Sequence, residues 1–129
     1  MKNILLITAI ILISGCSLFG ARFDNNEYES FVRLHTEITF AAENCNNPDV
    51  LRTNIYDIVK EVEFLYTYTK HLPNNNNTFN IVTILRSNIK ELDKAYTDGS
   101  KSETYCRAKL SILEQHLERS ISTVATKGR

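Results

Sequence analysis

Apolar residues recur at spacings of three and four in four segments of this chain, which is the pattern of amphipathic α-helices. The segments cover about residues 27–44, 48–71 and 78–97, and a fourth stretch follows Ser100. Their apolar stripes are Phe31, Leu34, Ile38, Ala41 and Cys45; Leu51, Ile55, Ile58, Val62, Leu65, Thr69 and Leu72; Val82, Leu85, Ile89, Leu92 and Tyr96; and Cys106, Leu110, Leu113, Leu117, Ile121 and Val124. No stretch of useful length alternates as a strand would. We therefore expect an all-α protein.

Short polar connections separate the four segments. Asn47 is a good N-cap and Pro48 a good first helical residue, and residues 73–77 combine a proline with a run of asparagines that favours a turn. Ser100 and Glu103 have the spacing of a capping box at the start of the fourth helix. Because short connections favour antiparallel neighbours, we predict a small antiparallel four-helix bundle.

The N-terminus has the layout of a bacterial secretory signal. One basic residue, Lys2, precedes an apolar run over residues 4–13, which is too short for a membrane-spanning helix. Ser14 and Gly15 then stand directly before Cys16, and this arrangement resembles a lipobox. The resemblance implies cleavage before Cys16 and acylation of that cysteine. An ordinary signal peptide or a short anchor helix is the alternative interpretation.

The lipobox divides the chain into three parts. Residues 1–15 are the predicted lipoprotein signal peptide, residues 16–26 a lipidated tether and residues 27–126 the helical bundle domain, with the tail beyond it expected to fray. Several acyl chains make such an anchor durable, because a single chain holds a protein at a membrane only marginally. In bacterial lipoproteins an aspartate after the acylated cysteine tends to retain the protein at the inner membrane. The serine at position 17 therefore implies the periplasmic face of the outer membrane.

Two cysteines remain once Cys16 carries lipid. In an oxidising compartment, a lone pair such as Cys45 and Cys106 in a small domain is usually a disulfide. An up-down-up-down bundle places the end of the first helix and the start of the fourth at the same end, so the predicted topology brings both thiols together. Closing a loop of this length contributes about 4 kcal/mol to stability. Two buried free thiols are the alternative.

The composition gives little support to catalysis or nucleic-acid binding. Removing residues 1–15 takes away one basic residue and leaves a formal charge of about −1, with no concentrated cationic face. The three histidines, His35, His71 and His116, fall on three different predicted helices, and no zinc signature or phosphate-binding glycine loop is present. We expect no enzyme, no cofactor, no metal site and no small-molecule substrate. An enzyme or metal carrier would instead bring the three histidines together.

Aromatic and aliphatic residues outside the stripes are the remaining lead. Phe64, Tyr66 and Tyr68 crowd the end of the second helix, and successive residues of a helix point about 100° apart, so these rings cannot all enter one core. Other apolar residues off the stripes are Phe40, Ile81 and Ile84. Such residues indicate either a wider core or a hydrophobic groove that receives a partner helix.

Together, the lipobox, the short tether, the small helical domain and the long-range cysteine pair resemble the PulS/OutS pilotins of type II secretion. The local match lies at the end of the first helix, where Cys45, Asn46, Asp49 and Val50 fit the family pattern. Asn47 and Pro48 depart from it, since a basic residue is usual at the first position and the family's proline comes later. Residues 92–96, followed by Cys106, resemble the family's last inter-helix turn.

The resemblance implies a physical mechanism. Pilotins are outer-membrane lipoproteins that capture a C-terminal helical segment of a secretin and escort this subunit to the outer membrane. Cys16 would supply the anchor, and Cys45 with Cys106 the clamp, while the motif match assigns no groove residues. The rival interpretation is a plasmid- or phage-encoded periplasmic lipoprotein that blocks entry of related elements, which the Ile-, Lys- and Asn-rich composition also fits.

Overall fold

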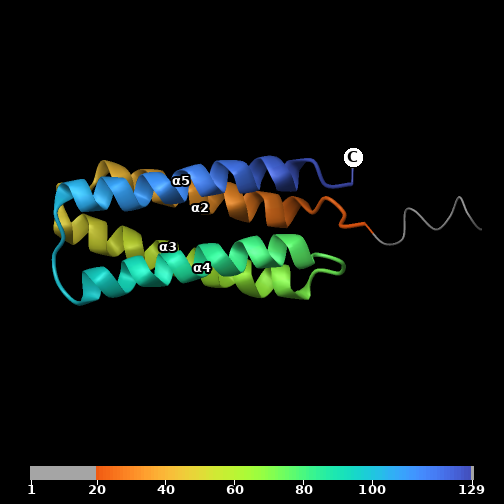
Figure 1. The fold of residues 1–129 in the computed structure, drawn as a ribbon, viewed down its shortest axis with the longest axis horizontal. Helices are drawn as coiled ribbons and strands as arrows, with labels where there is room; N and C mark the ends of the chain where they lie inside the picture. The colour runs from red at the N-terminus through yellow and green to blue at the C-terminus, as the bar shows by residue number, and fades with distance from the viewer. Residues whose placement is uncertain (1–19, 129) are drawn as a thin grey trace, which may run out of the picture.

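The computed structural model describes residues 20–128, and all regular structure in this range is helical. The helices are α2 (Asn25–Glu43), α3 (Pro48–His71), α4 (Asn76–Thr97) and α5 (Glu103–Ala125). They run antiparallel in sequence order and form the predicted four-helix bundle (Figure 1). None of them is both long and apolar enough to cross a membrane. The predicted signal peptide and Cys16 lie outside the described residues.

The N-caps of α3 and α5 confirm one prediction from the sequence and correct another. The Asn47 side chain caps α3 by accepting a hydrogen bond from the backbone of Val50, as predicted. At α5 the cap is Ser102, not Ser100: its hydroxyl accepts from the Tyr105 backbone at 3.1 Å. Glu103 does not complete a capping box, because its carboxylate accepts from the Arg107 side chain one turn later.

Two other helices begin earlier than the patterns indicated. Asp24 caps α2 by accepting from the Glu27 backbone at 2.8 Å, so the last two residues of the predicted tether are helical. Helix α4 takes in the end of the asparagine run, and the turn before it bends at Asn74, which has a φ of 56°. Asparagine tolerates this left-handed conformation better than most residues, which explains the position of the turn.

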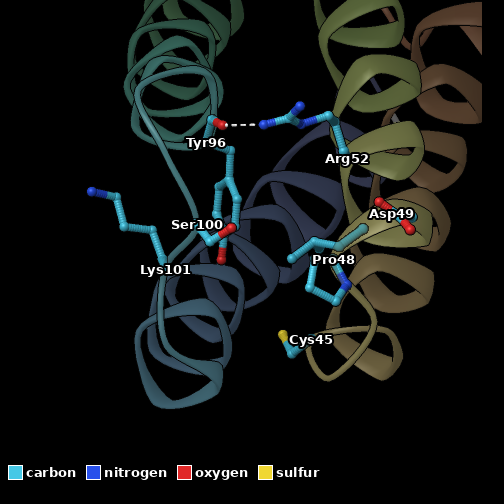
Figure 2. Close-up of a pocket in the computed structure, with 8 residues that line it drawn as sticks. Cys45, Pro48, Asp49, Arg52, Tyr96, Ser100 and Lys101 are labelled. Atoms are coloured by element: carbon cyan, nitrogen blue, oxygen red, sulfur yellow. Dashed lines mark hydrogen bonds between the residues drawn. The ribbon is translucent and has the colours of Figure 1, made fainter.

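The predicted disulfide is present. Cys45 follows α2, Cys106 lies in the first turn of α5, and their sulfurs are bonded with Cα atoms 5.7 Å apart. Cys45 lies beside the connection between α2 and α3, at the end of the bundle away from residue 20 (Figures 1 and 2). The bond therefore closes the end of the molecule that is far from the expected lipid anchor.

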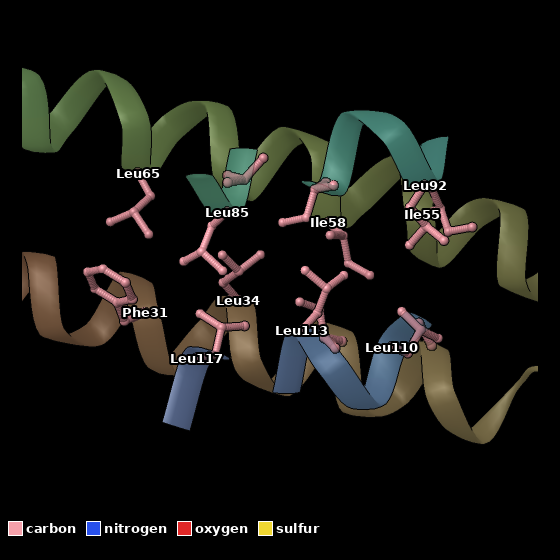
Figure 3. Packing of buried hydrophobic residues seen from close by; sticks show 14 of the residues in the cluster. Phe31, Leu34, Ile55, Ile58, Leu65, Leu85, Leu92, Leu110, Leu113 and Leu117 are labelled. Carbon is pink, nitrogen blue, oxygen red and sulfur yellow. The ribbon is translucent and has the colours of Figure 1, made fainter. Parts of the chain in front are cut away.

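The predicted stripes form the core. Every stripe residue is buried except Leu72 and Ile121, which are partly exposed. Leucine and isoleucine side chains from all four helices meet along the bundle axis, with Phe31 facing Leu65 near the tether end (Figure 3). Burying such a side chain contributes about 1.5–3 kcal/mol, so this core is the main source of the stability of the fold.

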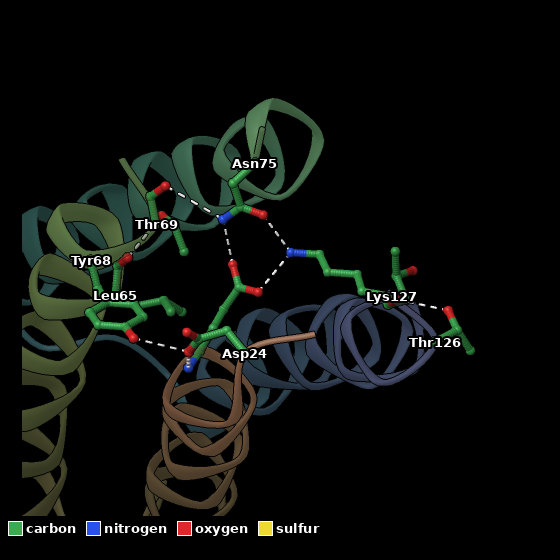
Figure 4. Close-up of polar contacts among 9 residues, drawn as sticks. Asp24, Leu65, Tyr68, Thr69, Asn75, Thr126 and Lys127 are labelled. Atoms are coloured by element: carbon green, nitrogen blue, oxygen red, sulfur yellow. Dashed lines mark hydrogen bonds and ion pairs between the residues drawn. The ribbon is translucent and has the colours of Figure 1, made fainter. Parts of the chain in front are cut away.

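A buried polar cluster closes the opposite end from the disulfide, and we call it the terminal cluster. It consists of Glu27 with the two residues that bond to it, Asn75 and Lys127, which Figure 4 labels. Glu27 is fully buried, and its carboxylate lies 2.7 Å from the Lys127 ammonium and 2.6 Å from the Asn75 amide. The Lys127 ammonium also donates to the Asn75 side-chain oxygen. The expectation that the tail frays is therefore wrong at Lys127, whose side chain is only 9% exposed because it pairs with a buried carboxylate.

Removing the disulfide should lower stability without changing the fold. We expect the Cys45→Ala/Cys106→Ala variant to lose about 4 kcal/mol of unfolding free energy, because its unfolded chain is no longer cross-linked. Urea denaturation followed by circular dichroism of the oxidised protein and the variant measures this loss. Equal midpoints for the two proteins would contradict a bond that constrains the unfolded chain.

The terminal cluster gives a second stability test. Replacing Lys127 with Met leaves the Glu27 carboxylate buried without its cation, and we expect a loss of about 3 kcal/mol. Lys70→Met is the matched control, because Lys70 is exposed and forms no ion pair among the described residues; its stability should change by less than about 0.5 kcal/mol. Adding Glu27→Gln to Lys127→Met should restore part of the loss. If Lys127→Met and Lys70→Met were equally stable, the ion pair between Glu27 and Lys127 would not be buried in solution.

Candidate partner-binding groove

The four helices do not pack equally closely around the bundle. Helices α2 and α3, α3 and α4, and α2 and α5 form extensive interfaces, whereas the interface between the neighbouring helices α4 and α5 is the smallest of the four. The close interfaces carry polar bridges as well. Glu63 on α3 accepts from Arg86 on α4 at 2.8 Å and lies 2.9 Å from the Lys90 ammonium, while Thr39 on α2 donates to Glu114 on α5. The seam between α4 and α5 is the open side of the bundle.

The polar bridge between α3 and α4 is strong enough to affect ionisation. The hydrogen bond from Arg86 and the nearby Lys90 ammonium hold the pKa of the Glu63 carboxyl below its ordinary value, against the opposing effect of burial. The bridge therefore stabilises the fold at neutral pH, and its contribution falls as the pH drops through the lowered pKa of Glu63. No bridge of this kind spans the middle of the seam between α4 and α5 in the described residues.

A groove of about 250 Å³ lies in this open seam, and we call it the α4–α5 groove. Its lining is almost entirely apolar on the α4 side. The lining residues are Ile81, Ile84, Leu85, His116, Arg119, Ser120 and Thr123. Leu85 is part of the core, Ile81 is partly buried against it, and Ile84 is 58% exposed. Ile81 and Ile84, which lie outside the predicted stripe, therefore extend the apolar surface from the core to the outside of the bundle.

The wall from α5 presents few free polar groups to the groove. The Ser120 hydroxyl donates to the His116 carbonyl oxygen at 2.7 Å, and the Thr123 hydroxyl donates to the Arg119 carbonyl oxygen at 3.0 Å. Both hydroxyls are therefore satisfied within their own helix. The exposed Arg119 side chain forms no ion pair or hydrogen bond with the other described residues, which leaves one free cation at the rim.

The apolar surface continues beyond the groove along α5. Ile112 is 51% exposed and precedes His116 by four residues, which places the two on the same face of the helix, one turn apart. Ile84 and Ile112 together extend the apolar strip along the seam. A strip of this shape suits the apolar face of an amphipathic helix, whose side chains also repeat every three or four residues.

Contacts join α4 and α5 on both sides of the α4–α5 groove. At the tether end, Lys127 just beyond α5 bonds to Asn75 just before α4. At the disulfide end, the rings of Tyr96 and Tyr105 pack with centroids 6.4 Å apart, and Lys109 lies 4.0 Å from Glu91. Because these contacts fix the spacing of α4 and α5, the groove exists before any partner binds.

Other exposed apolar residues do not gather in the same way. Phe64 is 53% exposed and stacks on Tyr68, while Tyr66 packs against Phe79, so the prediction that these rings cannot share one core is confirmed. Phe64 lines a depression of about 350 Å³ between α2 and α3 whose other members are Arg33, Glu37, Asp57, Lys60 and Glu61. That depression is dominated by charged side chains and is a poor receptor for an apolar helix face.

The predicted site residues fall into separate places. Cys16 lies outside the described residues, and Cys45 and Cys106 form the disulfide. His35 lies on α2, where its Nε2 is 3.7 Å from a Glu118 oxygen, whereas His71 ends α3 and His116 lines the α4–α5 groove. No group of three or more His, Cys, Asp or Glu side chains within residues 20–128 could hold a metal ion.

Sequence reasoning identified only part of this site. The off-stripe positions of Ile81 and Ile84 were the available signal, and both line the groove. The facing residues of α5 were missed, because periodicity does not reveal which pair of neighbouring helices packs loosely. The terminal cluster was also missed, since nothing in the local sequence indicates that Glu27 is buried.

Comparison with protein-family models, with curated proteins and with solved structures finds no match to this chain.

The exposure of Ile84 predicts opposite outcomes for neighbouring substitutions. Ile84→Ser should change the unfolding free energy by less than about 0.5 kcal/mol, because a surface side chain contributes little to stability. Leu85→Ala should cost about 2–5 kcal/mol, because it leaves a cavity in the core. Urea denaturation of the two variants checks both values. A large loss for Ile84→Ser would mean that the groove is closed in solution and that Ile84 is a core residue.

Proposed function

We propose that this protein is a pilotin: an outer-membrane lipoprotein that binds a C-terminal helical segment of a secretin and targets it to the outer membrane for type II protein secretion. The observation that carries the proposal is the α4–α5 groove, an apolar strip on a cross-linked bundle whose N-terminal sequence resembles a lipobox. The mechanism is physical, since the protein binds and carries a helix without altering it covalently.

The chemistry of the groove supports capture of a helix. A partner helix that places aliphatic side chains between Ile84 and Ile112 would bury both isoleucines. Each is already about half buried, so their full burial would contribute about 1 kcal/mol apiece, with the partner's own apolar surface adding more. An acidic residue beside that apolar face would pair with the free guanidinium of Arg119. These contacts would also shield an aggregation-prone segment during transit.

The place of the groove in the bundle supports a role close to the membrane. The residues of α4 and α5 that line it lie toward the tether end, near the start of α4 and the end of α5. Asp24, which caps α2, is eight positions after Cys16, so the chain between them spans at most about 29 Å. A helix held in the groove would therefore travel near the membrane that the lipid selects.

The proposal is tested in cells by following the secretin. Deleting the gene should remove secretin multimers from the outer-membrane fraction and reduce secretion, and restoring the protein should reverse both effects. A Cys16→Ala variant should fail to restore them, because a bundle without its lipid anchor is not targeted to the outer membrane. Unchanged outer-membrane multimers in the deletion strain would reject the proposal.

The groove itself is tested by a matched pair of variants. Ile84→Ser/Ile112→Ser should fold normally and stay in the outer membrane, yet lose at least about tenfold in affinity for the secretin segment, since two apolar contacts disappear. Tyr56→Ser/Phe64→Ser is the control, because it removes two exposed aromatic side chains from other faces. If the control lost binding and the groove variant kept it, the segment would bind elsewhere on the bundle.

A further inference from the structure

A second pocket lies at the disulfide end of the bundle, and none of its lining residues belongs to the α4–α5 groove. It has a volume of about 140 Å³, well below the roughly 300–1,000 Å³ of pockets that hold drug-sized ligands. It is lined by Cys45, Pro48, Asp49, Leu51, Arg52, Tyr96, Ser100 and Lys101. A pocket of this size suits a single small polar group.

The unusual feature of this pocket is the hydroxyl of Tyr96. The ring extends from the end of α4 into the pocket, toward Ser100 and the disulfide end (Figure 2). Tyr96 is only 6% exposed, and its hydroxyl oxygen is buried with no hydrogen-bond partner. A buried hydroxyl without a partner costs about 1–3 kcal/mol, so such groups are rare in folded proteins and call for a ligand or an ordered water.

The surroundings of this hydroxyl favour an acceptor that carries negative charge. Arg52 donates to the Tyr96 carbonyl oxygen at 2.9 Å, which places its guanidinium at the pocket and leaves further N–H groups free. Lys101 is exposed and forms no ion pair among the described residues. Asp49 is the one acid in the lining, and it lies on the opposite side of the pocket from Lys101 (Figure 2). The lining therefore carries a net positive charge.

The ionisation of Tyr96 agrees with a role as donor. Burial, and to a smaller extent the neighbouring Tyr105, raise the pKa of the Tyr96 hydroxyl above its ordinary value. The hydroxyl therefore keeps its proton at neutral pH and can donate it to an acceptor.

We infer that this pocket binds a carboxylate group, which accepts a hydrogen bond from the Tyr96 hydroxyl in a lining that carries the positive charges of Arg52 and Lys101. The carboxylate belongs either to a free small acid or to the side chain or C-terminus of a peptide. The site is independent of the proposed pilotin function, because it shares no residue with the α4–α5 groove.

NMR titration of the purified mature protein with sodium acetate tests the inference, with sodium chloride at the same ionic strength as the reference. We expect saturable shifts of the backbone amides around Tyr96 and Lys101 with acetate and no saturable shifts with chloride. Tyr96→Phe keeps the ring and removes only the buried oxygen; it should weaken acetate binding about tenfold, the loss expected for one hydrogen bond to a charged group. Tyr105→Phe is the control and should leave binding unchanged.

A second titration separates the two sources of the carboxylate. The titrants are a short peptide with a free C-terminal carboxylate and the same peptide amidated at its C-terminus. If the natural ligand is a chain end, the free peptide should bind more tightly than acetate, and the amidated peptide should bind more weakly than the free one. Acetate binding at least as tight as that of the peptide points to a free acid. Equal shifts with acetate and chloride, or an unchanged acetate affinity in Tyr96→Phe, would overturn the inference. Loss of the pilotin phenotype would not bear on either result.

Discussion

The structure depends on two fixed ends joined by an apolar core. The disulfide between Cys45 and Cys106 ties the end of α2 to the start of α5 at one end of the bundle. At the other end, the buried pairing of Glu27 with Lys127 and Asn75 ties the start of α2 and the end of α5 to the turn before α4. Each device acts between residues far apart in the sequence. Helices α4 and α5 are joined at one end of their seam by Lys127 and Asn75 and at the other by the packed rings of Tyr96 and Tyr105. Between these two sets of contacts, the helices leave the α4–α5 groove.

This arrangement connects stability with binding. When the walls of a groove must move to admit a partner, fixing them costs conformational entropy, and this lowers the affinity. A preformed groove avoids much of that entropy loss. Here the walls belong to two helices with buried core faces, and the satisfied hydroxyls of Ser120 and Thr123 leave mainly apolar surface to cover. The exposed Ile84 and Ile112 cost the free protein little stability, yet a helix that covers them gains their burial.

The sequence determined the architecture well, because the fold is built from local signals. The stripes, the Asn47 cap and the cysteine pair could all be interpreted from spacing alone, and they agree with the bundle. The sequence-based predictions failed where two neighbouring residues could both cap a helix, and where a side chain contacts residues that are distant in the sequence. Ser100 and Ser102 are both plausible caps, and only the path of the chain selects Ser102. The burial of Glu27, the pairing of Lys127 and the unpartnered hydroxyl of Tyr96 depend on residues from other helices, so periodicity could not predict them.

We propose that the open seam between α4 and α5 receives a helix of another protein. Photo-crosslinking in cells tests it most directly, with a photoreactive amino acid placed at position 84 in one strain and at position 56 in another. We expect an adduct with the C-terminal segment of a secretin from position 84 and none from position 56, an exposed position on α3, which does not line the seam. An adduct with the secretin from position 56 and none from position 84 would contradict it.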